Sequence, residues 1–420
     1  MIPGSGRRVP GGTRGKAGTT PMKRTLTSVV AAVVLATAAA QTQITFWHSM
    51  EGVEDAVVEL VNAYHASQDA VRVDVRYVGS YPEAQTRLIA AFGTGNEPVL
   101  FQAEIGFFPR LVGDGALHDL ADLVAELPAD LVADFYPGLW GYGDIGGGRY
   151  GLPWNASTPV MYYNADALRQ AGIAPPTTWD EFAAAAAALT TRASQGAMFV
   201  GDSWLFEMMV LSRGGTLVHD DGTPNLDSPE AIAALTMLRD LGRARHLAFF
   251  GAAESTPAIL AFVRTRSLMT FASIANWPDV RRFSVGFTLA AAPVPLEPGG
   301  RVPLGGAQLV VLRGASDEQR RAAFDFWRFL VEPENLASWI EASYYIPVRR
   351  SVIPLLDDFY GADPNRAAAL AQLELAVPRP RVPAFNAWRR LIDDALERAL
   401  RGNQTPQAAL AEAQRRALED

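Results

Sequence analysis

The first third of the chain switches repeatedly between strand-like and helix-like spacing of its hydrophobic residues. In the segment VRVDVRY, valines and a tyrosine alternate with charged residues, which predicts a strand with one solvated face. Other stretches place apolar residues three and four positions apart, as amphipathic helices do. We expect strands at 44–47, 71–77 and 98–103 and helices at 53–67 and 82–92. This order is typical of a parallel α/β sheet flanked by helices.

The rest of the chain continues the alternation of helices and strands. A capping box that opens at Thr178, and Ser228 placed before Pro229, mark two helix starts. Apolar runs at 283–295 and 306–312 predict further strands. Additional helices are expected at 317–330, from 333 onward, at 395–400 and from 405 onward. Because no flexible linker interrupts this pattern, we expect lobes joined by several short crossings.

Length and composition favour two lobes and exclude several kinds of chemistry. A chain of 420 residues with 49% hydrophobic residues has material for two cores. It contains no cysteine, which excludes disulfides, thiolate zinc sites, cysteine nucleophiles and a lipid-anchored cysteine. No lysine follows Lys23, which excludes a Schiff-base enzyme and a P-loop ATPase. A bound anion must therefore be met by arginine, hydroxyl groups or backbone N–H groups.

Residues 1–40 have the pattern of an export signal. A basic start at Met22 precedes an apolar run at 26–35 and a small-residue cleavage site at 38–40. The apolar run is too short to span a bilayer. We expect a signal peptide whose true start is Met22, and a soluble protein in the periplasm or a comparable extracytoplasmic space. Removal of all residues 1–40 takes away six basic and no acidic residues, so the formal charge moves from −8 to −14, which argues against nucleic-acid binding.

No catalytic motif stands out in the sequence. The five histidines are scattered, without the close spacing of a helix-borne metal site, and no Gly-x-Ser-x-Gly elbow occurs. The glycine cluster at 143–151 lacks the Lys-Ser/Thr of a phosphate loop and is interpreted as a hairpin turn. We therefore expect no enzyme, no metal and no cofactor. A pair of glycosidase carboxylates stays open, which keeps a secreted hydrolase as a less favoured alternative.

Polar and aromatic residues follow each of the first three predicted strands. FWHSMEG follows the first, GSYPEA follows the second, and Glu104 ends the third. Ligands gather at the carboxyl ends of strands in open α/β sheets, and a cleft between two lobes suits a small polar solute. The segment at 155–159, Asn-Ala-Ser-Thr-Pro, interrupts an apolar run and is predicted to be the first crossing between lobes, with Ser157 facing the gap.

Several motifs together resemble a known family. ITFWHSMEG, AAFGTGNEP, WNASTPVMYYNADAL, TTWDEF and LGGAQLVV, in this order, resemble the sn-glycerol-3-phosphate-binding periplasmic proteins of ABC transporters, within extracellular solute-binding protein family 1. The resemblance implies a two-lobed periplasmic-binding-protein fold of type II. Each lobe is expected to be a mainly parallel sheet flanked by helices, with the ligand in the cleft. The expected lobes are 41–154 plus 284–332 and 155–283 plus 333–420.

The resemblance also implies a set of ligand-binding residues, each matched to a position of the family: Tyr81, Glu104, Ser157, Trp204, Ser273, Gly306, Tyr345 and Arg389. Hydroxyls, a bare N–H and one arginine make a cage suited to phosphate. Glu104 would repel phosphate, so we expect it at the glycerol end of the ligand. The choice of Arg389 over Arg390 for the anion depends on where a gap is placed.

Two departures from the family pattern predict a roomier cleft. Gly201 stands where these relatives carry a second aromatic residue before Trp204, and the segment before Arg389 is shorter. A glycerophosphodiester such as glycerophosphocholine would use this room, and so would an uncharged oligosaccharide. For choline, we expect an aromatic cage of Trp204, Tyr345 and Trp388. Two other tryptophans on helical stripes, Trp327 and Trp339, are predicted to be core residues.

The function that follows is capture of glycerol 3-phosphate or a glycerophosphodiester by closure of the lobes, without chemistry on the ligand. The implied partners are the membrane permease subunits of an ABC importer with its ATPase, and the protein is expected to be a monomer. The alternative is a sugar- or oligosaccharide-binding protein of an ABC importer.

Overall fold

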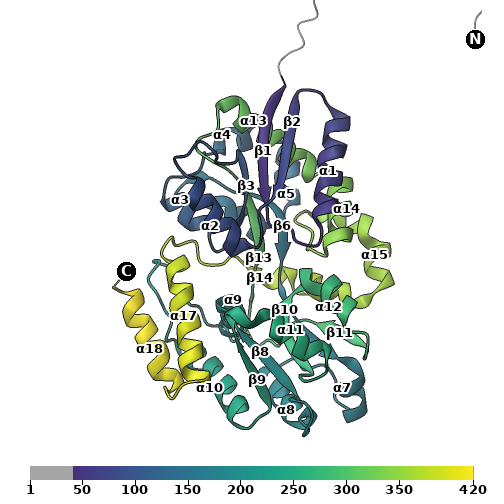
Figure 1. Ribbon diagram of the computed structural model, residues 1–420, viewed down its shortest axis with the longest axis vertical. Coiled ribbons are helices and arrows are strands. Elements are labelled where there is room, and N and C mark those ends of the chain that lie inside the picture. The colour runs from purple at the N-terminus through teal and green to yellow at the C-terminus, as the bar shows by residue number, and fades with distance from the viewer. Residues whose placement is uncertain (1–40, 420) are drawn as a thin grey trace, which may run out of the picture. The chain divides into compact units, whose positions relative to one another are not determined.

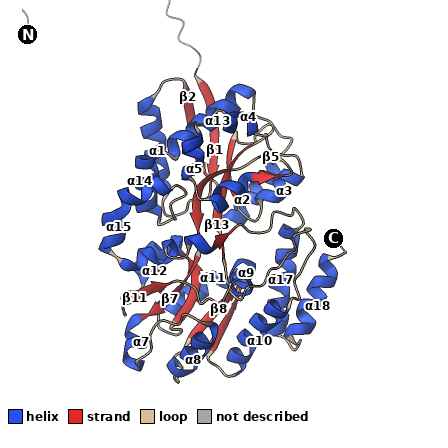
Figure 2. Cartoon of the chain, turned by 180° about the vertical axis from the view of Figure 1, so that it is seen from behind, coloured by secondary structure: helices blue, strands red, loops and turns tan. Residues whose placement is uncertain are grey.

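Residues 41–419, the part of the chain that this computed structural model describes, form one compact unit built of two lobes. Figure 1 shows them one above the other along the long axis, and Figure 2 shows from behind that strands lie inside and helices outside. The predicted α/β class and two-lobed architecture are confirmed. The predicted signal peptide lies outside the described residues.

The first lobe is built on a five-stranded sheet in the order β2-β1-β3-β13-β6. Its strands are β1 (Thr42–His48), β2 (Val71–Tyr77), β3 (Leu100–Glu104), β6 (Leu152–Ser157) and β13 (Gly305–Val311). β1 pairs in parallel with β2 and β3, as predicted. β13 runs antiparallel to β3 and β6, so the sheet is more mixed than expected. The reason is that β13 enters from the second lobe, whereas β3 and β6 run toward it.

Helices cover this sheet on both faces (Figure 1). The longer ones are α1 (Glu54–Ser67), α2 (Tyr81–Ala91), α13 (Asp317–Leu330) and α14 (Pro333–Ser343), and the shorter ones are α3 (Phe108–Gly113), α4 (Ala121–Ala125), α5 (Ala129–Asp134) and α6 (Pro137–Trp140). Capping boxes at Ser80 and Ser316 start α2 and α13. The glycine cluster forms the predicted hairpin between β4 (Asp144–Ile145) and β5 (Gly148–Arg149).

The second lobe contains two small sheets. β7 (Pro159–Asn164) lies antiparallel between β10 (Met269–Ser273) and β11 (Leu289–Ala292), and β8 (Ala197–Gly201) pairs in parallel with β9 (Leu247–Gly251). Its helices are α7 (Ala165–Ala171), α8 (Trp179–Leu189), α9 (Ser203–Leu211), α10 (Pro229–Arg243), α11 (Ser255–Val263), α12 (Trp277–Phe283), α17 (Phe385–Leu400) and α18 (Pro406–Ala417). The helix starts predicted at Thr178 and Ser228 are both present.

The chain passes from the first sheet to the second at Thr158, within the segment predicted to cross. β6 ends at Ser157 beside β13, and β7 begins at Pro159 beside β10. Thr158 is fully buried, and its hydroxyl accepts a hydrogen bond of 2.9 Å from the Gln372 side chain. The crossing is therefore held by a side chain from a distant part of the sequence.

Two segments lie differently from the expected lobe boundaries. β11 pairs with β7 in the second lobe, although 284–332 was assigned to the first. α14 packs against α1 in the first lobe, although 333–420 was assigned to the second. For α14 the reason is burial of an apolar face: Trp339 of α14 stacks on Trp154 of β6 with ring centroids 4.5 Å apart. The rest of the assignment stays a prediction.

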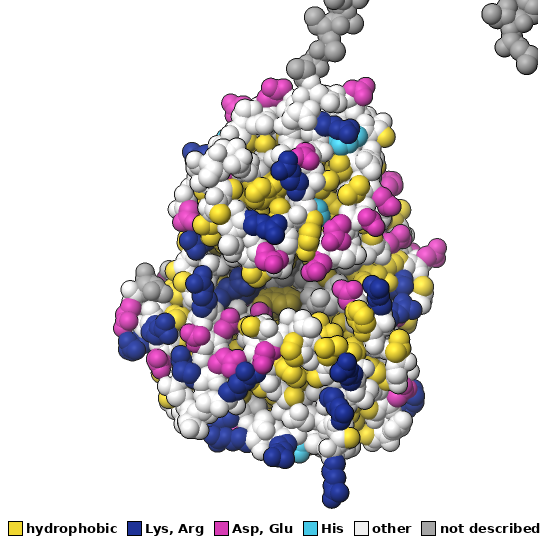
Figure 3. Space-filling view, viewed as in Figure 1, with side chains coloured by type: hydrophobic (Ala, Val, Ile, Leu, Met, Phe, Trp, Pro, Cys, Tyr) yellow, Lys and Arg dark blue, Asp and Glu magenta, His cyan; other side chains and the backbone are white. Residues whose placement is uncertain are grey.

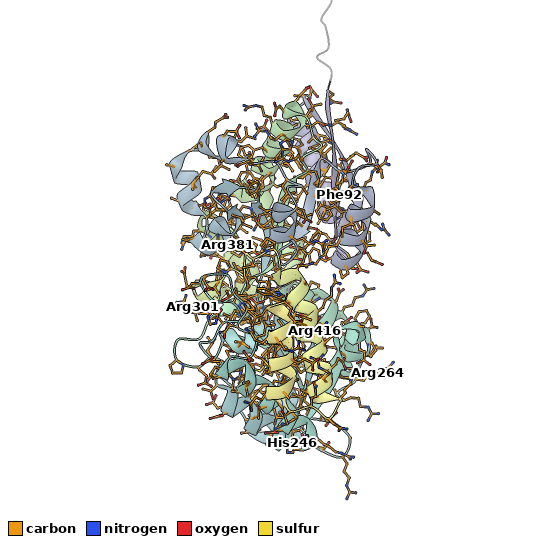
Figure 4. The ribbon with its side chains drawn as sticks, turned by 90° about the vertical axis from the view of Figure 1, so that its left-hand side faces the viewer. Phe92, His246, Arg264, Arg301, Arg381 and Arg416 are labelled. Carbon is orange, nitrogen blue, oxygen red and sulfur yellow. The ribbon has the colours of Figure 1, made fainter. Side chains whose placement is uncertain are left out.

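A final connection returns the chain to the second lobe. It runs from α15 (Asp357–Ala362) and α16 (Ala367–Leu370) through β14 (Ala376–Val377), which pairs with β12 (Val302–Pro303). Arg381, labelled at mid-height in Figure 4, donates hydrogen bonds to the carbonyl oxygens of Gly141 and Asp144 in the first lobe. This segment therefore touches both lobes before it enters α17.

Gly306 on β13 provides a test of the sheet geometry. Its φ is +99°, and a Cβ at this position would overlap the carbonyl oxygen of Asn155 on the neighbouring strand β6. We expect Gly306→Ala to lower the free energy of unfolding by about 2 kcal/mol or more, because strain and overlap add. Urea unfolding measures this change. Gly314→Ala is the matched control, since a Cβ there meets open space; equal effects of the two substitutions would contradict the assigned geometry.

Candidate functional site

A cavity of about 360 Å³ lies where the ends of the first-lobe strands face the second lobe. The surface is hollowed along this boundary (Figure 3). All eight residues predicted from the sequence line the cavity: Tyr81, Glu104, Ser157, Trp204, Ser273, Gly306, Tyr345 and Arg389. The structure therefore brings the whole predicted set together around one cavity, and the role of each residue stays a prediction.

The first lobe positions its share of these residues at strand ends. Tyr81 opens α2 directly after β2, and its hydroxyl accepts a hydrogen bond of 3.2 Å from the Asn155 side chain. Asn155 in turn accepts a bond of 2.9 Å from Gln102, whose own oxygen accepts from the Ser49 backbone N–H. Burial, reinforced by the neighbouring Tyr345 hydroxyl, raises the pKa of Tyr81 well above its usual value. Tyr81 is therefore a neutral phenol at physiological pH.

The second lobe contributes Trp204 and Ser273 to the opposite wall. The Trp204 indole N–H donates to the carbonyl oxygen of Leu304, at 3.1 Å, where the chain enters β13. A Cβ at Gly305 would lie 2.6 Å from the Trp204 ring and 2.7 Å from the Ser157 hydroxyl oxygen, so only glycine fits between them. The indole thus lies against bare backbone at the boundary between the lobes.

Glu104 is the centre of a buried ion-pair network that sequence reasoning did not foresee. Its carboxylate accepts from the Arg389 guanidinium at 2.8 Å and from Arg379 at 3.4 Å. Burial raises the pKa of Glu104, but Arg389 and Arg379 outweigh this effect and hold the pKa below its usual value. Sequence reasoning placed Glu104 at the glycerol end of the ligand because a carboxylate repels phosphate; in the structure its carboxylate is paired with Arg389, and its place relative to a ligand stays a prediction.

Arg379 and Glu207 complete the network and were both missed in the sequence. Both side chains are almost fully buried, and the Arg379 guanidinium donates to the Glu207 carboxylate at 2.8 Å. Burial raises the pKa of Glu207 in spite of this partner. A lone carboxylate within the apolar helix SWLFEMMVL was a signal that Glu207 needed a buried cation. No comparable signal marked Arg379.

Two further carboxylates lie beside Arg389. Asp202 follows β8 and caps α9, accepting hydrogen bonds from the Trp204 and Leu205 N–H groups. Applied to β8, the rule that polar residues at strand ends mark a site would have found Asp202. Asp393 lies one turn after Arg389 on α17, and burial together with the nearby Asp202 charge raises its pKa to about 7.

The structure separates several residues that the sequence grouped with the site. Arg389 lines the cavity, whereas Arg390, its neighbour on α17, lines a different hollow between α17 and α3. Trp388 is buried in the second-lobe core against Phe385, so the expected cage of Trp204, Tyr345 and Trp388 does not form. The reason is helix periodicity, which turns successive side chains of α17 by ~100°.

Gly201 does not create the expected room, because it lines neither this cavity nor a second cavity of about 280 Å³ among β8, β10, α9, α11 and α12. A Cβ at Gly201 would lie 2.6 Å from the Phe249 ring, so the side chain of Phe249 fills the space. Within residues 41–419 no helix is long and apolar enough to cross a membrane, and no cluster of histidine or carboxylate side chains is arranged to hold a metal ion.

Comparisons with known proteins agree with this architecture. The family model described as bacterial extracellular solute-binding protein matches residues 59–368. The sn-glycerol-3-phosphate-binding periplasmic protein UgpB of Escherichia coli K12 is 27% identical over 90% of this chain and 92% of its own length. Its counterpart from Yersinia pseudotuberculosis is 29% identical over 89% of this chain and 91% of its own.

Solved structures share the fold at lower sequence identity. UgpB from Mycobacterium tuberculosis in complex with glycerophosphocholine superposes with a TM-score of 0.81 at 24% identity, covering 90% of this chain and 98% of that one. The GacH receptor of Streptomyces glaucescens, solved unliganded and with acarbose, gives 0.80 at 23% identity, covering 91% and 100%. At this identity these two structures establish the fold alone.

Asp393 generates a pH-dependent prediction. The pKa of Asp393 is raised to about 7 in the folded state. Between the usual pKa of an aspartate and pH 7, the folded protein therefore keeps a proton that the unfolded chain has already released. The stabilisation from this proton is complete below about pH 4 and is lost as the pH rises to about 7. We expect the neutral Asp393→Asn variant to be more stable than the parent by roughly 1–2 kcal/mol at pH 8 and by about a third of that at pH 5.

Urea unfolding of the parent and variant at the two pH values measures the difference. Asp394→Asn is the matched control, because Asp394 is the next residue on α17 and is exposed. An equal gain at pH 5 and pH 8 would show that removal of the charge is not the cause.

Proposed function

The chain belongs to the bacterial extracellular solute-binding proteins, and we propose that it captures glycerol 3-phosphate or a glycerophosphodiester, such as glycerophosphocholine, for an ABC importer. The observation that carries the proposal is the placement of Arg389 with Tyr81, Ser157, Ser273 and Tyr345 around one cavity at the lobe boundary. A guanidinium and converging hydroxyls are the groups that recognise a phosphate ester in a chain without lysine near the site.

Binding proceeds by closure of the lobes around the ligand. The crossing at Thr158 and the connection through Arg381 are the segments about which such a rotation takes place, since each touches both lobes. The closed form is presented to permease subunits, and the associated ATPase drives release. The protein acts as a monomer in the periplasm or a comparable extracytoplasmic space, after removal of the signal peptide.

The ion pair between Glu104 and Arg389 opposes the binding of an anion at this site. A phosphate that approaches Arg389 competes with the Glu104 carboxylate, which is already bonded to the guanidinium at 2.8 Å. Arg379 lies on the other side of Glu104 and offers this carboxylate an alternative partner at 3.4 Å. Glu104 can therefore turn toward Arg379 and the ligand's hydroxyls when phosphate takes its place on Arg389.

In the proposed function, the protein forms and breaks no covalent bond of its ligand. A glycosidase needs a general acid whose pKa is raised toward neutrality. Glu104, the carboxylate that lines the cavity from the first lobe, has a lowered pKa because two guanidinium groups neutralise it. The second candidate ligand is a neutral sugar, for which a carboxylate and hydroxyls beside Trp204 are suitable partners.

Isothermal titration against glycerol 3-phosphate, glycerophosphocholine and maltose distinguishes these ligands. We expect saturable binding of a phospho-ligand, which is recovered intact after incubation. Binding of maltose alone would move the proposal to a sugar importer, and release of phosphate or of a free alcohol would contradict a binding function.

Substitution of Arg389 tests the anion contact. We expect Arg389→Ala to weaken phospho-ligand binding by about 1.5–3 kcal/mol, the range for hydrogen bonds to charged groups. Arg390→Ala, which removes the exposed neighbouring guanidinium from α17, should change it by less than ~0.5 kcal/mol. Equal losses in the two variants would show that Arg389 acts only through the overall charge of the protein.

A further inference from the structure

Two large apolar side chains project from one turn of the second lobe. The turn follows α12 and reads Arg-Arg-Phe-Ser-Val-Gly-Phe at 281–287, in which Phe283 is 54% and Val285 is 91% exposed. A Cβ at Gly286 would meet open space, so the turn stands out from the surface. We call Phe283 and Val285 the apolar tip. Single exposed apolar residues are ordinary on a protein surface, whereas two on one turn mark a contact site.

The backbone of the apolar tip is held in place on both sides. Ser284, between its two members, is buried, and its hydroxyl donates a hydrogen bond of 2.7 Å to the carbonyl oxygen of Val280 in α12. After the turn, the Thr288 N–H donates to the Asp166 carboxylate at 2.7 Å. The exposure of the tip is therefore built into the fold and is not that of a loose chain end.

Exposed arginines surround the apolar tip. Arg281 and Arg282 precede it directly. Arg264 and Arg266, between α11 and β10, line a hollow of about 590 Å³ whose wall also includes Gly286 of the turn. Arg264 points out from the second lobe in Figure 4. Among residues 41–419, Arg264, Arg266 and Arg282 form no ion pair, so their charges are available to a partner.

The carboxylates near the tip are fewer, and two of them are already paired. Asp166 lines the same hollow and is ion-paired with Arg169. Asp363 lies 3.8 Å from Arg281, and Asp279 is exposed on α12. With Arg169, five arginines thus face three carboxylates, which gives a local charge of +2. The whole chain without residues 1–40 has a charge of −14, so this face has the opposite sign.

The apolar surface continues from the tip onto α11, which packs against α12. Ile259 and Leu260 are exposed there, and Figure 3 shows hydrophobic side chains gathered on this lobe with arginines beside them. Projecting apolar side chains ringed by arginine match a bilayer surface, where lipid phosphates overlie acyl chains. A stable protein partner needs a broader apolar core than a projecting turn supplies.

We propose that this face of the second lobe binds the surface of an anionic phospholipid membrane. Phe283 and Val285 enter the headgroup layer, while Arg264, Arg266 and Arg282 meet lipid phosphates. The contact is peripheral and reversible, because few apolar side chains and few charges take part. It concentrates the protein at the bilayer whatever ligand the cleft binds.

Sedimentation with vesicles tests the proposal on the chain without residues 1–40. We expect binding to vesicles of equal parts phosphatidylglycerol and phosphatidylcholine to be about tenfold stronger than to phosphatidylcholine alone, and to fall to that level in ~0.5 M salt. The charge of −14 is repelled by anionic vesicles, so such binding comes from a local surface. Equal binding to both vesicle types, or binding to neither, would overturn the proposal.

Substitution of the tip tests the apolar part of the contact. We expect Phe283→Ser combined with Val285→Ser to weaken binding to the anionic vesicles about tenfold. The matched control is Val58→Ser combined with Leu418→Ser, which removes two exposed apolar side chains on α1 and after α18. Equal losses in the two double variants would show that the tip has no special role.

Substitution of two arginines tests the charged part. We expect Arg264→Gln combined with Arg282→Gln to weaken binding to the anionic vesicles about fivefold and to leave binding to phosphatidylcholine unchanged. Arg72→Gln combined with Arg87→Gln changes the overall charge equally, through exposed arginines of the first lobe, and should have little effect. Equal losses here would assign the effect to overall charge and contradict the proposal.

A fluorescent label reports insertion directly, because the chain contains no cysteine of its own. An environment-sensitive fluorophore on Val285→Cys should emit at shorter wavelength when anionic vesicles are added, and the same label on Val58→Cys should not. A shift at both positions, or at neither, would contradict insertion of the tip. Thermal unfolding and titration with glycerol 3-phosphate show whether each variant keeps its fold and its cleft.

The membrane contact and the proposed ligand function fail separately, because none of the substituted residues lines the cleft cavity. Loss of vesicle binding with intact ligand binding would leave the proposed function standing. If anionic vesicles bind no protein, whereas vesicles that carry a permease bind the parent and not the tip variant, the face binds a protein and the lipid assignment is wrong.

Discussion

The buried ion pairs among Glu104, Glu207, Arg379 and Arg389 are the interaction on which the arrangement of the lobes depends. Glu104 ends a first-lobe strand, Glu207 lies inside a second-lobe helix, and Arg379 belongs to the segment that connects the lobes. Removing charges from water costs several kcal/mol per ion, which only close pairing repays. The lobes therefore cannot move apart without either separating Glu104 from both guanidinium groups or admitting water to them. Any ligand that binds here changes both the hydration and the pairing of these charges.

This balance bears on which ligands the cleft of this chain can accept. The network is self-compensated, because two guanidinium groups face two carboxylates, and hydroxyl groups and Trp204 line the cavity beside it. The choice between ligands then depends on the groups that lie next to the ion-pair network. In this chain that neighbour is the cavity of about 280 Å³ among β8, β10, α9, α11 and α12, which shares Asp202 and Trp204 with the cleft.

Local structure was readable from the sequence because its signals are local. The capping boxes at Thr178 and Ser316, the hairpin glycines and the helical stripe of α1 each depend on residues a few positions apart. The eight cavity residues were found through strand ends and family resemblance. What could not be read were contacts between distant segments: the direction of β13, the pairing of Glu104 with Arg389, and the burial of Trp388 rather than its exposure in a cage. These depend on which face each element turns to its neighbours, and adjacent residues of α17 differ completely in this respect.

The aromatic rings behind the cavity give the molecule an optical property of its own. Trp154 stacks on Trp339 with an interplanar angle of 23°, and Trp339 stacks on Tyr345 at 13° with centroids 5.9 Å apart. Tyr345 lines the cavity, whereas Trp154 and Trp339 are sealed in the first-lobe core. Electronic transitions of rings stacked this closely couple, so the stack has a circular dichroism in the near ultraviolet that depends on the angle of its outermost member. A ligand that turns Tyr345 would therefore change the spectrum of two tryptophans that it cannot touch.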